Sequence, residues 1–371
     1  MNILAVVPDN NIVDILRIYS EWNPELRWHV ITIRPDAAEE SEDWMESATH
    51  LRVHDREMID CPPGPFPLES FCQYERACHE HRSPFIIHYL EYDSVAVEQG
   101  CLMLQKQMTA MLPVDAVVTW GERGWYNEVA IDFAETHGLS ICRLERATFP
   151  GMLVADGTGL EQGRCDLEMW HRMEWPRTSK SRWNWAIEAC VTRKMQFDWW
   201  LSTAVWQNIE PQERTTAGMV NRFLDDRPSI FVPMQVPFDT NLIFRANHQN
   251  NFTMLEYVAE NYPNHRVLVK MHPADRFSDK HNVAAYCADH GWEYVMLGSH
   301  AIIDAVDKIV SINSQCIIEA WMHNTEVEIL GQPAFDLPDE TDKEALLYTL
   351  RFAYYIEPWQ LTERLKGIVN R

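Results

Sequence analysis

The segment at residues 232–239, Val-Pro-Met-Gln-Val-Pro-Phe-Asp, places two polar side chains directly after an apolar run. Gln235 and Asp239 follow this predicted strand four positions apart. A carboxylate held just past the end of a strand can act as a nucleophile or a base, because the scaffold fixes its direction. The local pattern supports a second interpretation equally well, in which Asp239 caps a helix beginning at Thr240.

A second segment, Val-Leu-Val-Lys-Met-His-Pro at residues 267–273, delivers Lys270 and His272 to the end of another predicted strand, which Pro273 ends. Both side chains donate hydrogen bonds of the kind that bind phosphate or carboxylate groups. The alternative is structural, because a lysine on a strand often faces solvent and a histidine beside a proline often has no ligand.

The third segment runs from Lys308 to Ala320 and consists of an apolar run, a polar turn at Asn313 and Ser314, and a helical pattern. The free backbone amides and the positive dipole end of a helix bind phosphate without a glycine-rich loop. Glu319 lies far enough into this helix to reach a ribose hydroxyl. Ordinary helix capping by Asn313 or Ser314 is the competing interpretation.

The N-terminal half carries further candidates. Glu145 ends a predicted strand and is a candidate acid or base, while Arg123 and Arg146 are suited to hold acidic sugar groups. Asp156 is the reserve acid/base candidate. It begins the segment Asp-Gly-Thr-Gly-Leu-Glu-Gln-Gly, whose third glycine comes one position too late for a dinucleotide fingerprint, so a turn-rich loop is expected there.

The elements that position these residues alternate between strand and helix patterns, as in parallel α/β sheets. Strands are expected in the first half at residues 3–7, 28–33, 51–54, 116–120 and 140–144, with helices at 12–22 and 126–137. In the second half, strands are expected at 230–236, 267–271, 293–297, 308–312 and 327–330, with helices near 252–261, 282–290, 314–323 and 343–355.

This pattern predicts two Rossmann-like lobes, one at residues 1–165 and one with C-terminal helices at residues 227–371. The intervening residues 166–226 are dense in tryptophan and are expected to form a helical insertion, with most indoles in packing roles. An aromatic platform for sugar rings is the other interpretation of that segment. Ligands in such sheets bind beyond the carboxyl ends of the strands, and the default site of a two-lobed protein is the cleft between its lobes.

Composition excludes several classes of protein. The net charge of −23 repels nucleic acid and anionic lipid, so no nucleic-acid partner is expected. No apolar run is long enough to span a membrane, and nine cysteines without an export signal indicate reduced thiols and a cytoplasmic protein. Cysteines and histidines also gather between Cys72 and His88, but their spacing matches no zinc pattern, and neither a metal nor a cofactor is expected.

The order of these motifs resembles that of the bacterial capsule-polysaccharide biosynthesis family of retaining β-Kdo transferases. The resemblance rests on a Gly-Glu-Arg turn, the Glu145 block, Gln-Val-x-x-Asp, Lys-x-His-Pro, and the Ser-Ile-Asn-Ser run that leads to Glu-Ala, and it is most specific between residues 230 and 331. Arg146 stands where the family usually has glycine. The resemblance implies a variant of the two-lobed GT-B fold and transfer of 3-deoxy-manno-octulosonic acid (Kdo) from CMP-β-Kdo to a growing glycan.

The resemblance also implies the roles of individual residues. Asp239 would attack the anomeric carbon, with Glu145 as the partner that transfers the proton of the acceptor hydroxyl. The donor would be held by the remaining C-terminal candidates, which are Gln235, Lys270, His272, Asn313, Ser314 and Glu319. Among them, His272 and the helix start would bind the CMP phosphate, and Glu319 would bind the ribose. The partners are then a nucleotide-sugar donor and a glycan acceptor of O-antigen, lipopolysaccharide or capsule synthesis. Peripheral contact with the inner membrane, and a place within a larger polysaccharide-synthesis enzyme, both remain compatible with the sequence.

Three alternatives stay open. A nucleotide-sugar epimerase of the same architecture also has a His-Pro after a strand, but carries a glycine-rich phosphate turn where this chain has Ser311-Ile-Asn-Ser314. A transferase of another CMP-sugar, such as sialic acid, would use the same donor residues. A glycan-binding subunit would instead use the tryptophan-rich middle segment.

Overall fold

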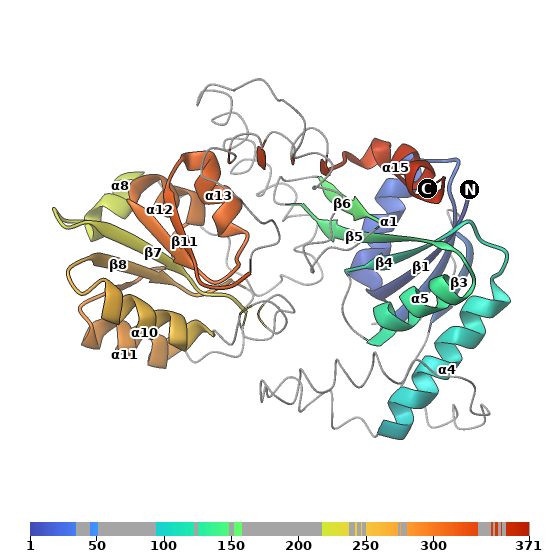
Figure 1. The fold of residues 1–371 in the computed structure, drawn as a ribbon, viewed down its shortest axis with the longest axis horizontal. Coiled ribbons are helices and arrows are strands. Elements are labelled where there is room, and N and C mark those ends of the chain that lie inside the picture. The colour runs from blue at the N-terminus through green and yellow to red at the C-terminus, as the bar shows by residue number, and fades with distance from the viewer. Residues whose placement is uncertain are drawn as a thin grey trace. The chain divides into compact units, whose positions relative to one another are not determined.

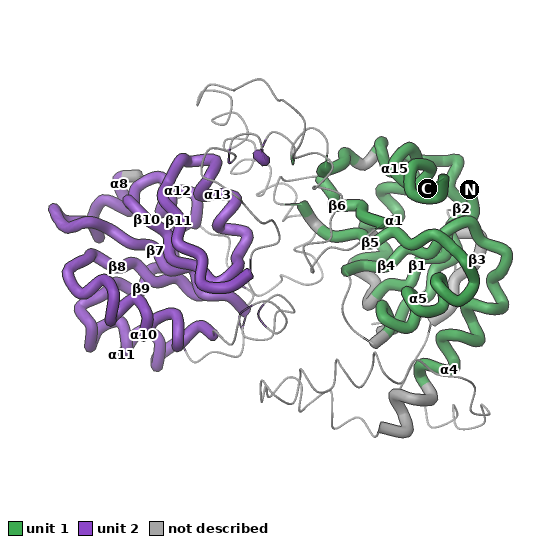
Figure 2. Tube along the Cα trace, viewed as in Figure 1, with its two compact units in different colours: residues 1–147, 151–172, 350–371 green, residues 148–150, 173–349 purple. Residues whose placement is uncertain are grey.

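The computed structural model describes residues 1–34, 45–50, 94–121, 125–147, 152–157, 217–236, 242, 246, 250–273, 275, 280–332, 343, 346–347, 350 and 354–370. The chain divides into two compact units, which are described one at a time (Figure 2). Unit 1 comprises residues 1–147, 151–172 and 350–371, and unit 2 comprises residues 148–150 and 173–349.

Unit 1 contains a six-stranded sheet with the order β3-β2-β1-β4-β5-β6. Its first five strands are mutually parallel, and β6 runs antiparallel to β5. The side chains of Ile3 to Val7 are at most 1% exposed, which is the continuous apolar pattern of a strand covered on both faces. The strands are β1 (Asn2–Asp9), β2 (Arg27–Arg34), β3 (Met45–His50), β4 (Ala116–Trp120), β5 (Ser140–Arg146) and β6 (Leu153–Asp156).

The helices of unit 1 cover this sheet (Figure 1). They are α1 (Asn10–Trp22), α4 (Ser94–Ala110), α5 (Trp125–Thr136), the 3-10 turn η5 (Pro358–Gln360) and α15 (Leu361–Val369). Helices α4 and α5 join the sheet in one apolar core, in which Leu104 and Phe133 pack against the cluster that includes Leu4 and Val117.

The last helix packs on the N-terminal sheet. Oδ1 of Asn23, just after α1, accepts hydrogen bonds from the backbone amide and the hydroxyl of Thr362, at 3.0 and 2.9 Å. Leu153 of β6 and Ile356 also form an antiparallel bridge. Residues 350–371 therefore pack with unit 1, whereas the boundary expected from the sequence groups them with the C-terminal domain. The contact with Asn23 and the buried apolar side chains of α15 both hold this segment, and an amphipathic pattern does not reveal which unit it packs on.

Unit 2 contains a five-stranded sheet with the order β11-β10-β7-β8-β9, and every strand pair in it is parallel. The strands are β7 (Ser229–Pro233), β8 (Arg266–Lys270), β9 (Glu293–Tyr294), β10 (Lys308–Ser311) and β11 (Glu326–Ile329). The helical elements are α8 (Ala217–Val220), η2 (Asn221–Phe223), α10 (Asn251–Asn261), α11 (Lys280–Asp289), α12 (Ser299–Ala305) and α13 (Cys316–His323).

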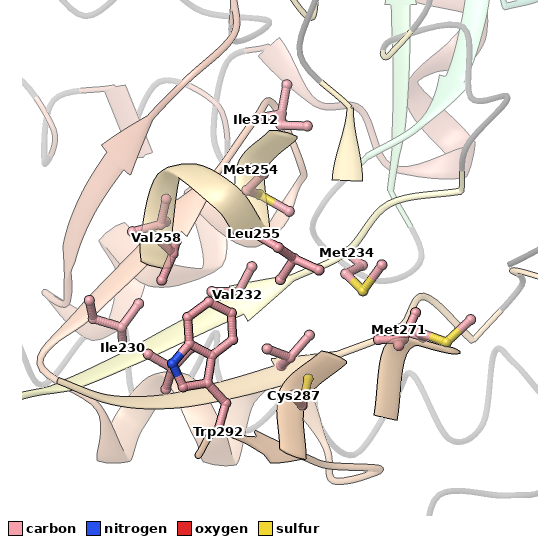
Figure 3. Close-up of a cluster of buried hydrophobic side chains, with 14 of the residues drawn as sticks. Ile230, Val232, Met234, Met254, Leu255, Val258, Met271, Cys287, Trp292 and Ile312 are labelled. Carbon is pink, nitrogen blue, oxygen red and sulfur yellow. The ribbon is translucent and has the colours of Figure 1, made fainter. Parts of the chain in front are cut away.

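Apolar clusters lie on both faces of this second sheet. On one face, residues of α10 and α11, including Met254 and Cys287, pack on Val232 of β7 (Figure 3). On the other face, α12 contributes Ile302 and Ile303 to a second cluster. Alternate residues of the strands thus face opposite helical layers, as in doubly wound sheets.

The strand order of each unit reverses at its centre. In unit 1 the reversal falls between β1 and β4, and in unit 2 it falls between β7 and β10. In open parallel sheets, ligands bind beyond the carboxyl ends of the strands at this switch point. The loops after β7 and β10 are therefore the first place to look for a site in unit 2.

The two predicted Rossmann-like lobes are confirmed, and most of the expected strands agree with the observed ones to within two residues. Several expected features lie outside the described residues. They are the strand expected at 51–54, residues 166–216 of the tryptophan-rich segment, most of the helix expected at 343–355, and the residues between Cys72 and His88. Within the part of the chain that the structure describes, no helix is both long and apolar enough to cross a membrane.

The four cysteines among the described residues are free thiols. Burial raises the pKa of Cys142 to about 12 and that of Cys287 to about 11. Thiols with such pKa values are weak nucleophiles near neutral pH, so neither of these cysteines is a candidate for covalent catalysis.

Candidate functional site

Gln235 and Asn313 join the two strands that flank the switch point of unit 2. Nε2 of Gln235 donates to Oδ1 of Asn313 at 2.8 Å, and the backbone amide of Asn313 donates to Oε1 of Gln235 at 3.2 Å. Gln235 follows β7 and Asn313 follows β10, so this pair, named here the switch-point clasp, links the two loops where a ligand would bind. The clasp uses one of the two Nε2 hydrogens and one of the two Oε1 lone pairs, so it positions Gln235 while its predicted donor contact stays a prediction.

The backbone of Gln235 is fixed as well. Its amide donates to Oδ1 of Asn251 at 2.9 Å, and Nδ2 of Asn251 donates to its carbonyl at 2.7 Å. The preceding Met234 is 2% exposed, and Figure 3 shows it at the same end of the apolar cluster as Met271. The chain that leads toward Asp239 thus leaves β7 from a rigid anchor.

Lys270 and His272 follow the neighbouring strand but have different surroundings. Lys270 is 4% exposed, and its Nζ donates to the hydroxyl of Ser299, at the start of α12, at 3.0 Å. His272, two residues later, is exposed. The structure therefore offers His272 to a ligand, while Lys270 contributes a buried positive charge that also ties β8 to α12.

The turn before α13 makes part of the expected phosphate site. Oγ of Ser314 accepts a hydrogen bond from the amide of Cys316 at 3.2 Å, but the N-cap position of α13 is Gln315, and no side chain caps this helix. Asn313 does not cap the helix but belongs to the clasp. Both residues are half-buried at the carboxyl end of β10, beside the positive end of the α13 dipole.

Glu319 is buried within α13 and contacts a histidine that the sequence gave no reason to select. Its Oε1 lies 3.6 Å from Nε2 of His300, on α12. Nδ1 of His300 lies 3.1 Å from Nε2 of His323, at the end of α13. A histidine pair formed by residues 23 positions apart follows from the packing of two helices, so only the tertiary structure reveals it.

The expected nucleophile, Asp239, lies outside the described residues, as does the helix start that it was alternatively expected to cap. Its role therefore stays a prediction. The structure describes the residues up to Val236, three positions before it.

In unit 1, Glu145 lies near the carboxyl end of β5, where the sequence predicts an acid or base. It is half-buried, and a Cβ placed on Gly121 would lie 3.8 Å from its Oε2. Gly121 has φ +79°, which favours glycine, and its amide donates to the carbonyl of Leu144 at 2.7 Å. A glycine turn at the end of β4 therefore lies beside the Glu145 carboxylate.

Asp156 has a different environment from Glu145. It is 1% exposed, and the hydroxyl of Tyr354 donates to its Oδ2 at 2.7 Å. It pairs in register with Arg143, two residues before Glu145 on β5. This burial and its tyrosine partner favour a structural role for Asp156.

The two arginines expected to hold acidic sugar groups are not described in enough detail to place their side chains. Arg123 lies outside the described residues. Arg146 ends β5 and pairs in register with Leu153, so only its backbone position is known. Their roles stay predictions.

These features define an α/β protein of two Rossmann-like units, the second of which carries a polar site at its topological switch point. In a comparison with protein families, residues 194–350 match the family described as capsule polysaccharide biosynthesis protein. The family resemblance stated from the motifs is thereby confirmed over this segment, which is less than half of the chain. It contains Gln235, Asp239, Lys270, His272, Asn313 and Glu319.

Comparison with solved structures gives remote similarities. The chain resembles the β-Kdo 2,7 transferase of KpsC from Thermosulfurimonas dismutans with 14% identity and a TM-score of 0.49, covering 100% of this chain and 99% of that one. The β-Kdo 2,4 transferase of the same KpsC has 16% identity and a TM-score of 0.46, covering 69% of this chain and 87% of that one. The UDP-GlcNAc 2-epimerase of Methanocaldococcus jannaschii in complex with UDP-GlcNAc and UDP has 10% identity and a TM-score of 0.37, covering 100% of this chain and 99% of that one. No curated protein sequence matches the chain.

Proposed function

We propose that this chain is a glycosyltransferase that moves β-Kdo from CMP-β-Kdo to a glycan acceptor, with retention of configuration, in the synthesis of a bacterial O-antigen or capsule. The observation that carries the proposal is the switch-point clasp between Gln235 and Asn313. It lies inside the segment that matches capsule polysaccharide biosynthesis proteins, at the sheet position where a nucleotide ligand is expected.

The donor binds through a few local groups in an otherwise acidic chain. The amides at the start of α13, with Ser314 and the exposed His272, bind the CMP phosphate. The buried Lys270 adds positive charge near the same strand ends. Glu319 accepts hydrogen bonds from the ribose hydroxyls. This arrangement suits a donor that is an anion, even though the net charge of the chain is −23.

The transfer proceeds in two displacements. The Asp239 carboxylate attacks the anomeric carbon of Kdo, the bond to the CMP phosphate breaks, and a glycosyl-enzyme forms. Glu145 then takes the proton of an acceptor hydroxyl, whose oxygen attacks the same carbon and releases Asp239. Two inversions restore the original configuration. The burial of Asp156 is the reason to prefer Glu145 over it as the proton acceptor.

The proposed chemistry requires no metal or cofactor from the protein. CMP is a good leaving group, and charge that develops on its phosphate is stabilised by His272, Lys270 and the helix start. Donor and acceptor are the partners that the reaction needs. A cytoplasmic location, with or without contact with the inner membrane, fits the proposal, as does membership in a larger polysaccharide-synthesis enzyme.

The experiment is to incubate the protein with CMP-β-Kdo, generated in place because it is labile, and Kdo-capped or other glycan acceptors. We expect CMP release that depends on acceptor and a product heavier by one Kdo residue. Parallel reactions with CMP-sialic acid and UDP-GlcNAc identify another donor or an epimerase. The proposal is rejected if none of several acceptors gives CMP release from CMP-β-Kdo. It is also rejected if UDP-GlcNAc is the one substrate that the protein converts.

A further inference from the structure

Four titratable side chains form a chain of contacts between α12 and α13 in unit 2. Oδ1 of Asp304 lies 3.2 Å from Nδ1 of His323, and Nε2 of His323 lies 3.1 Å from Nδ1 of His300. Nε2 of His300 then lies 3.6 Å from Oε1 of Glu319, which is an ion-pair distance. Among the described residues no group of three or more such side chains is arranged to hold a metal ion, so these four groups act as a chain and not as a metal centre.

The polarity of this chain follows from its exposed end. The carboxylate of Asp304 only accepts hydrogen bonds, so Nδ1 of His323 carries the proton in that contact and Nε2 of His323 is left to accept. Nδ1 of His300 must therefore donate to His323. The remaining nitrogen of His300 faces Glu319, where a lone pair would meet a carboxylate and a proton gives attraction. A proton on Nε2 of His300 would thus point at the Glu319 carboxylate, across the 3.6 Å between that nitrogen and Oε1.

Burial also favours the neutral form of the His323 ring. The side chains of His300 and Glu319 are 11% and 9% exposed, and that of His323 is 5% exposed, whereas that of Asp304 is 68% exposed. Burial, followed by the charge of His300, lowers the pKa of His323, which keeps that ring neutral as the acceptor in the chain. The buried carboxylate of Glu319 lies within ion-pair distance of His300, and this contact can fix its orientation.

The first turn of α12 also connects to the strand that carries the phosphate-binding candidates. Ser299, the residue before His300, accepts the hydrogen bond of Lys270. Two adjacent residues of α12 therefore contact different parts of the proposed donor site: Ser299 contacts Lys270 of β8, and His300 contacts Glu319 of α13. A change in the position of α12 would move both.

We propose that His300, supported by His323 and Asp304, is a positioning residue that holds the carboxylate of Glu319 in place for the ribose hydroxyls of the donor nucleotide. This rests on the proposed function, in which Glu319 binds that ribose. His300 does not touch the reacting atoms. It orients a group that recognises the nucleoside, so it acts on donor selectivity.

The test compares binding of CMP and of its 2′,3′-dideoxy analogue by calorimetry, because the analogue keeps the base and phosphate but lacks both ribose hydroxyls. We expect the wild-type protein to prefer CMP by on the order of tenfold, about the value of one net hydrogen bond to a charged group. The variant His300→Asn, whose amide reaches the Nδ1 position but not Nε2, is expected to lose most of this preference. The variant His300→Gln, whose amide nitrogen reaches the Nε2 position, is expected to regain part of it.

Two further variants keep the test sharp. His323→Gln leaves His300 in place but weakens its support, and an intermediate loss of preference is expected. His290→Gln alters an exposed histidine on the surface of the same unit and should retain the wild-type preference. Melting temperatures show whether each variant is folded.

The outcomes separate this inference from the proposed function. If wild-type protein discriminates between the two nucleotides and folded His300→Asn does so equally, the positioning role is wrong while the donor site stands. If wild-type protein binds both nucleotides equally, the ribose role of Glu319 fails and the inference fails with it. If it binds neither, the proposed CMP-sugar donor is wrong.

Discussion

Gln235 and Asn313 exchange two hydrogen bonds, at 2.8 and 3.2 Å, between the loops that follow β7 and β10. These are the two strands at which the order of the C-terminal sheet reverses. The clasp therefore sets the distance between the loop that leads to Asp239 and the turn that begins α13. A transferase that binds its donor at this position depends on that distance.

Replacing Gln235 by alanine removes the clasp and leaves the Asn313 side chain without its Gln235 donor. We expect a loss of stability of about 1 kcal/mol, the net contribution of a typical hydrogen bond, and weaker binding of CMP. Gln315→Ala is the matched control, because Gln315 is exposed in the same turn and makes no side-chain capping bond. Equal CMP affinity in the two variants would show that the clasp does not shape the donor site.

His272→Ala tests the phosphate contact. A charge-assisted hydrogen bond contributes roughly 1.5–3 kcal/mol, so the Kd for CMP should rise by roughly ten- to 150-fold. The Kd for cytidine, which lacks the phosphate, should change little. A variant that binds both ligands as the wild-type protein does would remove His272 from the donor site.

A pair of isosteric variants distinguishes the roles of Glu145 and Asp156. Glu145→Gln should lower kcat by about 10²–10⁴-fold at unchanged melting temperature, because a general base is lost from a half-buried position. Asp156→Asn should lower the melting temperature and leave kcat of the folded protein near the wild-type value, since Asp156 is buried against Tyr354. The reverse pattern in the two variants would assign the acid/base role to Asp156.

The stability of unit 2 should depend on pH through His323. Its pKa is lowered from the ordinary 6.5 by burial and by His300, while Asp304 and Glu319 oppose the shift. The unfolded chain therefore binds this proton more readily, and the stabilisation is fully present above pH 6.5 and is lost as pH falls through the folded pKa.

We expect the melting temperature to fall between about pH 7.5 and about pH 5, and His323→Gln to show a smaller fall. His290→Gln provides the control, because His290 is exposed. A pH profile of His323→Gln that coincides with that of the wild-type protein would contradict this assignment.

Much of the fold follows from local sequence patterns. The apolar run at residues 3–7 and the strand that ends at Trp120 are visible in the sequence because their side chains are covered on both faces of a sheet. The motifs also placed Gln235, His272 and Asn313 at one edge of the second sheet, because parallel strands share one carboxyl edge.

Other features depend on contacts between distant residues. The four residues of β6 give too short a pattern to be recognised, and their pairing with β5 is antiparallel. The packing of α15 on unit 1 depends on the contact between Asn23 and Thr362, and the link from Glu319 through His300 depends on how α12 lies against α13. In the same way, the pairing of Gln235 with Asn313 joins residues 78 positions apart and is not visible in the sequence.

Retention through Asp239 is tested most directly by the anomeric configuration of the product. NMR determines this configuration for the product that wild-type protein forms from CMP-β-Kdo and a glycan acceptor. We expect a new β-Kdo linkage in this product. We also expect that this product disappears in folded Asp239→Ala, whereas Asp289→Ala, on α11, still forms it. An α-Kdo linkage, or a β-Kdo product formed undiminished by Asp239→Ala, would contradict retention through Asp239.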